Sequence, residues 1–461
     1  MAGLKEFIAS PGSHKTLVVG SGKSGFAALK FLHKLGCRVA LSEKAKESAL
    51  DGRLLDWLKE RDVYYETGGH RRETFLDADL IVVSPGVPLE MEELAAARQA
   101  GIEIVGELGL GAAYLQIPIV AVTGTNGKTT VTKLIGELLQ AAGRKVFVGG
   151  NIGTPLIDYL LGEQDAEIAV LEVSSYQLDT AGEFRPDVAV LLNISPDHLD
   201  RYASYDDYAA AKMKIFACQQ PEDLAIVNAD DQEILRRLEA DPVAAKTLWF
   251  GKELADRPGA VVEEGEIILK GMFSHEEKYG LPEELMKSPN RENAMAATLA
   301  ARVMACPDEA INKGLAEFHR PPHRLFRVIE INGVSYFDDS KATNVGAVQS
   351  ALEGMTQPVI LIAGGRDKGG DYLYLQESVR AKVKKMVLIG EAREKMAKAF
   401  EGITSIEMAD SLEQAVLKAA RCAEQGDAVL LSPACASFDM FKSYADRGER
   451  FQKAVWSLMN K

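Results

Sequence analysis

The sequence predicts an α/β protein of three domains, each with a largely parallel sheet. Short apolar runs alternate with helical periodicity in the first, middle and last parts of the chain. Glycine-rich turns follow several of these runs. Alternation of this kind builds parallel sheets with helices on both faces. A third observation, the segment Phe318-His319-Arg320-Pro321-Pro322, predicts a linker because its prolines restrict the backbone.

Domain limits follow from this pattern, and we expect them at residues 1–108, 109–320 and 321–461. In the first domain the predicted strands are residues 16–19, 38–41, 80–83 and 103–105, and the predicted helices are residues 25–35 and 89–100. In the second domain we expect strands at residues 117–122, 168–171, 188–192 and 225–227, and a helix at residues 131–142. In the third domain the strands are residues 334–337, 358–363, 387–389 and 428–431, and the helices are residues 344–353 and 412–423.

Composition excludes several classes of protein. The 461 residues are 47% hydrophobic and 26% charged, as in a globular protein with more than one core. The net charge of −14 argues against nucleic acid or an anionic membrane as the main partner. The sequence has neither an apolar run of membrane-spanning length nor the pattern of a signal peptide. The five scattered cysteines predict reduced, mostly buried thiols, and we expect a cytoplasmic location.

The most informative motif is Gly124-Thr125-Asn126-Gly127-Lys128-Thr129-Thr130, between a predicted strand and a predicted helix. Backbone N–H groups at a helix start bind phosphate, a lysine there reaches the β- and γ-phosphates, and the first threonine hydroxyl can ligate Mg²⁺. Val122 stands where a full P-loop motif has its first glycine. We therefore expect ATP as a ligand, the alternative being a glycine turn that only caps a helix.

A second glycine motif, Gly20-Ser21-Gly22-Lys23-Ser24-Gly25, directly follows the first strand, and Glu43 ends the next strand. This spacing is typical of dinucleotide binding, with a tight turn, a close approach of the diphosphate and an acid for a ribose hydroxyl. The motif favours diphosphate binding over a turn needed only for packing. It leaves open whether the nucleotide is NAD or another diphosphate.

Polar groups also follow two buried strands of the second domain. Glu172 ends one strand, where ligands gather in open α/β sheets, and is a candidate Mg²⁺ ligand or a helix-capping acid. Asn193, Asp197 and His198 crowd the end of the next strand, although a histidine there can also cap a helix. Imidazole prefers softer metals than Mg²⁺, so His198 alone does not predict a metal.

Lysines and polar strings elsewhere give weaker signals. Lys212 and Lys214 lie on a predicted amphipathic helix, where the pattern favours a solvated face for both. In the third domain, polar or glycine-rich strings follow three strands and open helices, where helix capping is the simpler interpretation. They are Asp338-Asp339-Ser340-Lys341-Ala342-Thr343-Asn344, Gly364-Gly365-Arg366-Asp367-Lys368-Gly369-Gly370 and Ser432-Pro433-Ala434-Cys435-Ala436-Ser437.

In this chain order, the motifs resemble those of the Mur ligase family over essentially the full length. The matching strings are TGTNGKTT, GGNIGTPL, LEVSSYQLD, NISPDHLDRY, AAKMKIF, HRLFRV, DDSKATN, AGGRDKGGD and LSPACASFDMFKSYADRGERF. DSKATN and the last string point to a member that adds D-glutamate. The resemblance implies a Rossmann-like UDP-binding first domain, a central P-loop ATPase-type domain and a Rossmann-like third domain that binds an amino acid.

The resemblance also implies roles for individual residues. Lys128, His198 and Lys212 would be catalytic, with Lys212 carried as a carbamate, and Mg²⁺ would be held by Thr129, Glu172, His198 and Lys212. ATP contacts would be Gly124, Thr125, Asn126, Gly127, Lys128, Thr129, Thr130, Asn290, Asn293, Arg324 and Asp339. Contacts to the UDP substrate would be Gly20, Ser21, Gly22, Gly25, Glu43, Ser84, Gly86 and Asn151. The D-glutamate pocket would contain Thr343, Lys368, Ser437 and Phe438. The sequence departs from the family at Pro289, where a histidine is usual.

The activity implied is the ATP-dependent addition of D-glutamate to UDP-N-acetylmuramoyl-L-alanine through an acyl phosphate, in cytoplasmic synthesis of peptidoglycan precursors. We expect a monomer with ATP and Mg²⁺ as cofactors and no nucleic-acid or membrane partner. Alternatives within the class are a sibling ligase for another amino acid or a folylpolyglutamate-type synthase. Outside it, an NAD-dependent oxidoreductase would use the motif at residues 20–25, and a non-catalytic nucleotide-binding scaffold would release no ADP.

Overall fold

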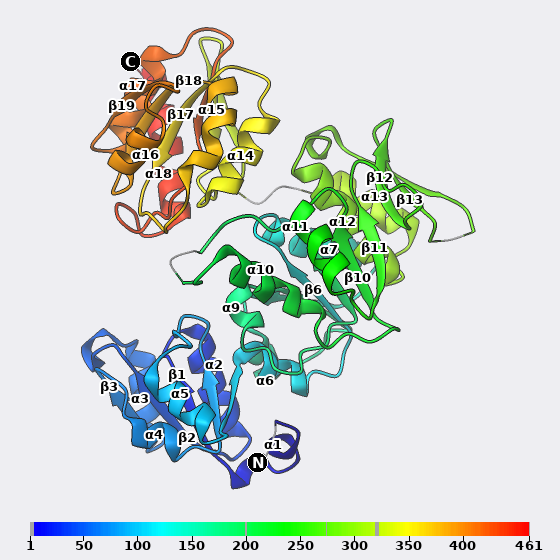
Figure 1. Ribbon diagram of the computed structural model, residues 1–461, viewed down its shortest axis with the longest axis vertical. Coiled ribbons are helices and arrows are strands. Elements are labelled where there is room, and N and C mark those ends of the chain that lie inside the picture. Colours follow the sequence, from blue (N-terminus) through cyan, green and yellow to red (C-terminus); the bar gives the residue numbers. More distant parts are fainter. Residues whose placement is uncertain (1–3, 199–200, 273, 319–321, 461) are drawn as a thin grey trace.

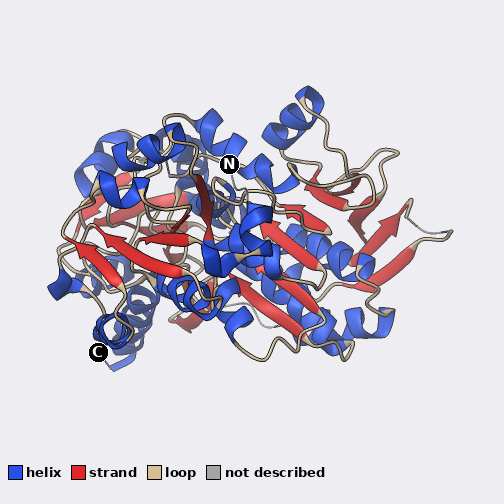
Figure 2. Cartoon of the chain, turned by 90° about the horizontal axis from the view of Figure 1, so that it is seen from below, coloured by secondary structure: helices blue, strands red, loops and turns tan. Residues whose placement is uncertain are grey.

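The computed structural model describes residues 4–198, 201–272, 274–318 and 322–460. The chain forms three lobes in sequence order, coloured blue, cyan to green, and yellow to red in Figure 1, and each lobe has its own sheet. Helices flank the strands throughout, as Figure 2 shows. The predicted α/β class is therefore confirmed. Residues 319–321 of the predicted linker lie outside the described residues.

The N-terminal sheet is fully parallel, with strand order β3-β2-β1-β4-β5. Its strands are β1 Lys15–Val19, β2 Arg38–Glu43, β3 Tyr64–Thr67, β4 Leu80–Val83 and β5 Glu103–Gly106. Its helices are α1 Leu4–Ala9, α2 Lys23–Lys34, α3 Gly52–Glu60, α4 Arg72–Leu76 and α5 Glu92–Gln99. Leu17 and Val18 pack into cores on opposite faces of the sheet. Burial of both faces explains why these strands are continuous apolar runs.

The central sheet has nine strands in the order β14-β13-β12-β11-β10-β9-β6-β8-β7. They are β6 Ile119–Thr123, β7 Val146–Gly150, β8 Ile168–Glu172, β9 Val188–Leu191, β10 Leu224–Asn228, β11 Lys246–Phe250, β12 Gly259–Glu263, β13 Glu266–Lys270 and β14 Glu277–Gly280. The helices are α6 Glu107–Tyr114, α7 Lys128–Ala141, α8 Leu156–Leu161, α9 Ser175–Leu178, α10 Tyr205–Met213, α11 Gln232–Ala240, α12 Asn290–Val303 and α13 Asp308–Glu317. The sequence prediction omitted the antiparallel extension β12-β13-β14, which turns at Glu264 and Gly265, both in the left-handed region.

The C-terminal sheet has the order β15-β16-β20-β17-β18-β19, and only the β15-β16 pair is antiparallel. Its strands are β15 Phe326–Ile331, β16 Val334–Asp338, β17 Val359–Gly364, β18 Val383–Ile389, β19 Ser405–Met408 and β20 Ala428–Leu431. Its helices are α14 Val345–Gly354, α15 Gln376–Lys382, α16 Arg393–Ala399, α17 Leu412–Cys422 and α18 Tyr444–Trp456.

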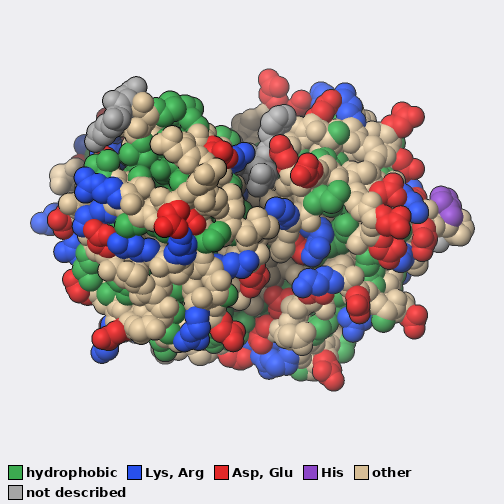
Figure 3. Space-filling view, turned by 90° about the horizontal axis from the view of Figure 1, so that it is seen from above, with side chains coloured by type: hydrophobic (Ala, Val, Ile, Leu, Met, Phe, Trp, Pro, Cys, Tyr) green, Lys and Arg blue, Asp and Glu red, His purple; other side chains and the backbone are tan. Residues whose placement is uncertain are grey.

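The expected limit between residues 108 and 109 falls inside α6, which packs on α8. In turn, α8 contacts α2 of the N-terminal lobe. The limits at residues 1–108, 109–320 and 321–461 remain a proposal, in which each domain contains one of the three sheets. None of the described helices is long and apolar enough to cross a membrane. Positive and negative side chains intermingle on the face shown in Figure 3.

Candidate functional site

The loop between β6 and α7 is held in a tight arch by its own lysine. Lys128 Nζ donates hydrogen bonds to the carbonyl oxygens of Gly124 at 2.7 Å and Thr125 at 2.8 Å. Gly127, at φ +88°, precedes the helix, and no side chain caps the first turn. A Cβ on Gly127 would lie 2.4 Å from Asn293 Oδ1, so the close packing there requires glycine. The uncapped N–H groups of α7 are therefore placed to bind an anion.

Neighbouring strand ends support this loop. Asn193, after β9, accepts the N–H of Asn126 at 2.8 Å and donates its amide to the Asn126 carbonyl at 3.1 Å. Thr125 Oγ1 lies 3.0 Å from the hydroxyl of Tyr208 on α10. Asn193 therefore positions the loop between β6 and α7.

Glu172 is the buried acid at the end of β8 and is 2% exposed. Its Oε1 accepts a hydrogen bond from Asn151 Nδ2 at 2.7 Å, while its Oε2 is buried without a hydrogen-bond partner among the described residues. It is not the cap of α9, because Ser174 and Gln177 form a capping box there. A buried, unpartnered carboxylate oxygen is costly, and a cation would satisfy it.

Lys212 corrects the prediction of a solvated lysine. It is 1% exposed, and its Nζ donates to the Gly124 carbonyl at 2.8 Å. Burial, with the neighbouring charge of Lys128, holds the pKa of Lys212 well below its ordinary value. Lys214, two residues on, lies at the surface and forms an ion pair with Asp179 at 2.7 Å. Tertiary packing thus separates two lysines that the helical pattern could not distinguish.

His198 lies in the loop after β9 in the left-handed region, at φ +57°. Its ring centroid is 4.9 Å from that of Tyr176, and its Nε2 is 3.6 Å from Asp197 Oδ2. Burial lowers the pKa of His198 to about 4 against the opposing charge of Asp197, and nearby lysines lower it further. The imidazole is therefore neutral at neutral pH, the form that ligates metals. Ser204, not His198, caps α10.

These groups test whether Mg²⁺ fits. Among the described residues no three His, Cys, Asp or Glu side chains form a metal cluster. The unpartnered Glu172 oxygen and the Thr129 hydroxyl suit Mg²⁺, whereas a cationic Lys212 would repel it. A carbamate on Lys212 would convert that cation into an oxygen ligand. The residues fit Mg²⁺ with that modification or with phosphate oxygens completing the shell.

A pocket with about 610 Å³ of empty volume lies between the loop from β6 to α7, α12 and the start of the C-terminal lobe. Seven of the residues predicted to contact ATP line it: Asn126, Gly127, Thr130, Asn290, Asn293, Arg324 and Asp339. Pro289, the departure from the family pattern, lines it too. The other four predicted ATP contacts belong to the same loop and helix start but are not lining residues: Gly124, Thr125, Lys128 and Thr129.

Buried polar side chains form hydrogen bonds that fix the part of this pocket contributed by the C-terminal lobe. Asp339 accepts the N–H of Leu325 at 3.0 Å and the hydroxyl of Ser432 at 2.8 Å. Burial raises the pKa of Asp339 to about 7. Lys341, a lining residue that the sequence prediction missed, has its Nζ 3.8 Å from the ring centroid of Tyr444. Burial lowers the pKa of Lys341 to about 8.

A second pocket, with about 940 Å³ of empty volume, lies at the carboxyl ends of β1, β2 and β4. Six of the predicted UDP-substrate residues line it: Gly20, Ser21, Gly22, Glu43, Ser84 and Gly86. Lys23, Lys44 and His70 also line it, although the prediction did not include them. Two predicted residues do not. Gly25 is buried against Gly20, whose carbonyl oxygen would lie 2.0 Å from an added Cβ, and Asn151 contacts Glu172 in the central lobe.

The carboxylate of Glu43 binds backbone N–H groups of the loops that surround this pocket. Its two oxygens accept N–H groups from Ser21 at 2.7 Å and Ala45 at 2.8 Å. Burial opposes ionisation, but these hydrogen bonds prevail and lower the pKa of Glu43. The acid is ionised and fixes the turn after β1.

A third pocket, with about 300 Å³ of empty volume, lies where the loop after β9 meets the C-terminal lobe. Of the residues predicted to bind D-glutamate, Thr343 and Lys368 line it. Ser437 and Phe438 are not lining residues: the serine is buried and the phenylalanine is 65% exposed. The central lobe contributes Asp197 and His198, which brings the third pocket beside the residues around Lys128.

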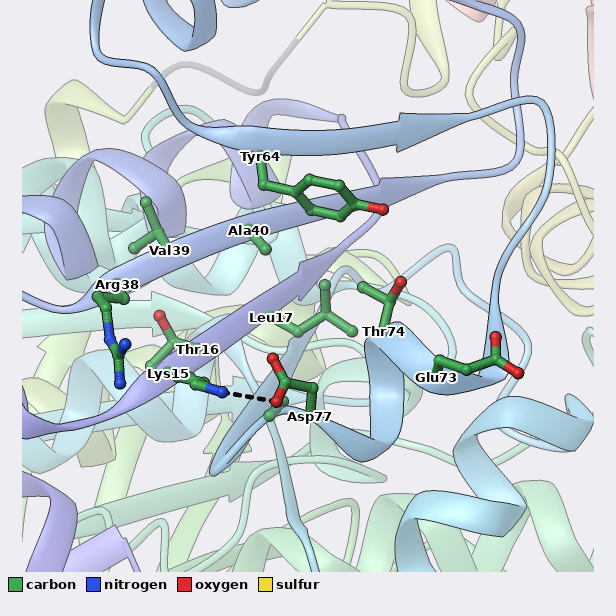
Figure 4. A pocket seen from close by; sticks show the side chains of 11 residues that line it. Lys15, Thr16, Leu17, Arg38, Val39, Ala40, Tyr64, Glu73, Thr74 and Asp77 are labelled. Carbon is green, nitrogen blue, oxygen red and sulfur yellow. Dashed lines mark hydrogen bonds and ion pairs between the residues drawn. The ribbon is translucent and has the colours of Figure 1, made fainter.

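A larger pocket, with about 990 Å³ of empty volume, lies away from these groups (Figure 4). It is lined by Lys15, Arg38 and Tyr64, the first residues of β1, β2 and β3. Figure 4 shows the Lys15–Asp77 ion pair at one end and the Tyr64 ring over the strands. Because ligands of open α/β sheets bind at the carboxyl ends, this pocket at the amino ends is not the active site.

Comparison with known proteins follows the three lobes. Residues 14–106 match a family model described as the Mur ligase MurD-like N-terminal domain, residues 122–301 the Mur ligase middle domain, and residues 323–435 the Mur ligase glutamate ligase domain. The chain is 44% identical to the UDP-N-acetylmuramoylalanine–D-glutamate ligase of Desulfosudis oleivorans and 45% identical to that of Desulfotalea psychrophila. Each alignment covers 97% of both chains.

Solved structures share the fold at lower identity. A pseudomurein peptide ligase type C from Methanothermus fervidus superposes with a TM-score of 0.62 at 20% identity, covering 96% of this chain and 100% of that one. A MurF ligase from Thermotoga maritima in complex with ADP gives a TM-score of 0.58 at 22% identity, covering 91% and 95% of the two chains. These structures support the arrangement of three α/β domains.

Proposed function

The chain belongs to the Mur ligase family, and we propose that it adds D-glutamate to UDP-N-acetylmuramoyl-L-alanine with ATP as the energy source. The observation that carries the proposal is the match, over 97% of the chain, to ligases named for this reaction. Family membership is inconsistent with an NAD-dependent oxidoreductase. We place the reaction in peptidoglycan precursor synthesis and propose that the protein acts as a cytoplasmic monomer.

In this proposal, each of the three pockets lined by predicted site residues binds one substrate. The pocket at the carboxyl ends of β1, β2 and β4 binds the UDP group, with the N–H groups at the start of α2 and the cations Lys23 and Lys44 facing the diphosphate. The pocket beside Asn293 and Arg324 binds ATP. The pocket at Lys368 binds D-glutamate.

The reaction begins when the L-alanyl carboxylate attacks the γ-phosphate and displaces ADP. An oxygen–phosphorus bond forms as the bond to ADP breaks, and the developing negative charge needs fixed positive groups. Lys128 Nζ is held at the arch of the loop for this purpose. The D-glutamate nitrogen then attacks the carbonyl carbon of the acyl phosphate, and phosphate leaves.

Mg²⁺, when bound, would neutralise phosphate charge. We propose Thr129, Glu172, His198 and a carbamylated Lys212 as its holders. Carbamylation requires an unprotonated amine, and burial already favours that form of Lys212. Its nitrogen attacks the carbon of CO₂, one N–H proton goes to solvent, and the product is an anionic carbamate.

The test is ADP release from ATP and UDP-N-acetylmuramoyl-L-alanine, screened over amino acids. ADP should form with D-glutamate and not with L-glutamate, L-lysine or D-alanine. ADP formation with another amino acid would identify a sibling ligase. Absence of ADP with every amino acid would refute the proposal in favour of a nucleotide-binding scaffold.

A further inference from the structure

Asp197 is an acid in the pocket proposed for a dicarboxylic amino acid. It lies in the loop after β9, and its side chain is 9% exposed. Thr343, Lys368 and Asn344 line the same pocket from the C-terminal lobe. A buried carboxylate repels both carboxylates of glutamate, so its place there needs an explanation other than binding them.

The contacts of Asp197 come from both lobes. Oδ2 accepts a hydrogen bond from Asn344 Nδ2 at 2.8 Å, and Oδ1 accepts from the N–H of His198 at 2.9 Å. Lys368 Nζ lies 3.2 Å from Oδ1. The anionic side chain therefore comes from the central lobe and the cationic one from the C-terminal lobe, and the two are in direct contact within the pocket.

A free amino acid is a zwitterion, and this pair of charges complements it. We propose that Asp197 binds the α-ammonium group of the incoming D-glutamate while Lys368 takes one of its carboxylates. The inference rests on the proposed function and deepens it by assigning the amino group a binding residue. The substrate exchanges the Asp197–Lys368 ion pair for two ion pairs of its own.

The position of Asp197 also orients the nucleophile. Asn344 Nδ2 donates both to Asp197 Oδ2 at 2.8 Å and to Asn126 Oδ1 at 3.2 Å, so Asp197 lies beside the loop that precedes Lys128. An ammonium at Asp197 is therefore on the side of the pocket where the acyl phosphate forms, with the carboxylates directed towards the C-terminal lobe. When the C–N bond forms, the C–O bond to phosphate breaks and its electron pair leaves on phosphate. Of the two protons that the ammonium loses, one goes to the released phosphate and one to solvent.

Asp197→Asn keeps the size and the Asn344 neighbour but removes the charge. We expect the KM for D-glutamate to rise at least about tenfold, with the KM values for ATP and the UDP substrate within about twofold of the original. Asp197→Glu should recover most of the loss by restoring a carboxylate. The matched control is Asp165→Asn, which removes an aspartate paired with Lys145 on the surface of the same lobe and should change nothing. An ATP KM that rises as much as that for D-glutamate would overturn the assignment.

Replacing D-glutamate with an uncharged nucleophile tests whether Asp197 binds the ammonium group or instead helps to activate the L-alanyl carboxylate. Hydroxylamine is uncharged at neutral pH and can attack the acyl phosphate to give a hydroxamate. Asp197→Asn should form this hydroxamate at a rate within about twofold of the unmodified protein. A loss of hydroxamate equal to the loss of D-glutamate turnover would show that Asp197 serves the ATP or acyl-phosphate step, and the inference would be wrong.

An analogue lacking the ammonium gives a second readout. (R)-2-hydroxyglutarate has both carboxylates but a neutral hydroxyl, so Asp197 should disfavour it. The ratio of its inhibition constant to the KM for D-glutamate should fall about tenfold in Asp197→Asn, and an unchanged ratio would contradict the inference. The proposed function fails separately, if the unmodified protein releases no ADP with D-glutamate.

Discussion

Lys128 and Lys212 donate hydrogen bonds to the same acceptor, the carbonyl oxygen of Gly124, at 2.7 Å and 2.8 Å. One lysine opens α7 and the other comes from α10, 84 residues later in the chain. Two ammonium groups at one oxygen repel each other, which favours the neutral form of the more buried lysine. Burial lowers the pKa of both lysines, and that of Lys212 falls well below its ordinary value. We therefore propose Lys128 as the phosphate-binding cation and Lys212 as the amine open to modification.

Replacing Lys128 with alanine should abolish ADP formation while leaving UDP-substrate binding intact. The cation belongs to the loop after β6, whereas the pocket proposed for the UDP group is formed by the N-terminal lobe. Calorimetric titration with UDP-N-acetylmuramoyl-L-alanine measures the second property directly. Equal loss of binding and turnover would show that the two sites are not independent.

Lys212→Ala should be nearly inactive, because it removes the proposed carbamate. A short carboxylic acid added to the assay should partly restore activity by occupying the vacated volume with a carboxylate. Lys214→Ala is the matched control, since Lys214 pairs with Asp179 at the surface, and it should retain activity. If Lys212→Ala kept full activity and Lys214→Ala were inactive, Lys214 would be the lysine that matters and the assignment to Lys212 would be wrong.

The pKa of His198 should be measurably lowered, because the imidazole is largely buried. Its pKa in the folded protein is lowered to about 4, below the ordinary value of about 6.5 expected in the unfolded chain. Between these values the unfolded chain binds a proton that the folded chain does not, so stability falls as pH drops from about 6.5 to about 4. His198→Gln should flatten this slope in urea denaturation. An NMR titration midpoint near 6.5 in the native protein would disprove the shift.

Lys368→Ala should raise the KM for D-glutamate about tenfold or more, because a charge-assisted contact contributes roughly 1.5–3 kcal/mol. The KM for ATP should change little, since the pocket proposed for ATP is lined by other residues. D-glutamine should be a poor substrate, because its amide leaves a cationic group unmatched. Steady-state kinetics with the three substrates checks this, and similar turnover of D-glutamine would count against Lys368 as a carboxylate ligand.

Arg447 should matter for stability, because it is fully buried and joins two loops of the C-terminal lobe. It donates to Ser340 Oγ at 2.9 Å, to the Ser340 carbonyl at 2.8 Å and to the Cys435 carbonyl at 3.1 Å. Arg447→Met would leave these acceptors unsatisfied and should destabilise the protein by about 3 kcal/mol.

The control for Arg447 lies on the same helix. Arg450 is exposed, with a long ion pair to Asp446 at 3.6 Å and its guanidinium 5.6 Å from the ring centroid of Phe441, so Arg450→Met should cost less than about 1 kcal/mol. Urea denaturation of both variants gives the comparison. Equal midpoints would mean that the buried hydrogen bonds contribute nothing to stability.

Local pattern was sufficient for the α/β class and for most of the predicted strands. Apolar runs such as those of β4 and β20 coincide with the observed limits, because both faces of a parallel strand are buried and its composition shows this directly. The predicted helix at residue 89 begins instead at Glu92, as helix starts depend on a few local contacts.

The sequence by itself determined the glycine-rich loop before α7 and the acid at the end of β8, since a glycine turn before a helix and a carboxylate at a strand end are local features. Tertiary structure decided which of two helical lysines is buried, placed Gly25 and Asn151 outside the pocket at β1, and set Asp197 opposite Lys368. These properties depend on segments far apart in the chain meeting at one sheet edge, 171 residues apart for Asp197 and Lys368. Lys212 is buried because distant segments of one lobe pack together, and Asp197 pairs with Lys368 because two lobes meet, so no local pattern in the sequence predicts either.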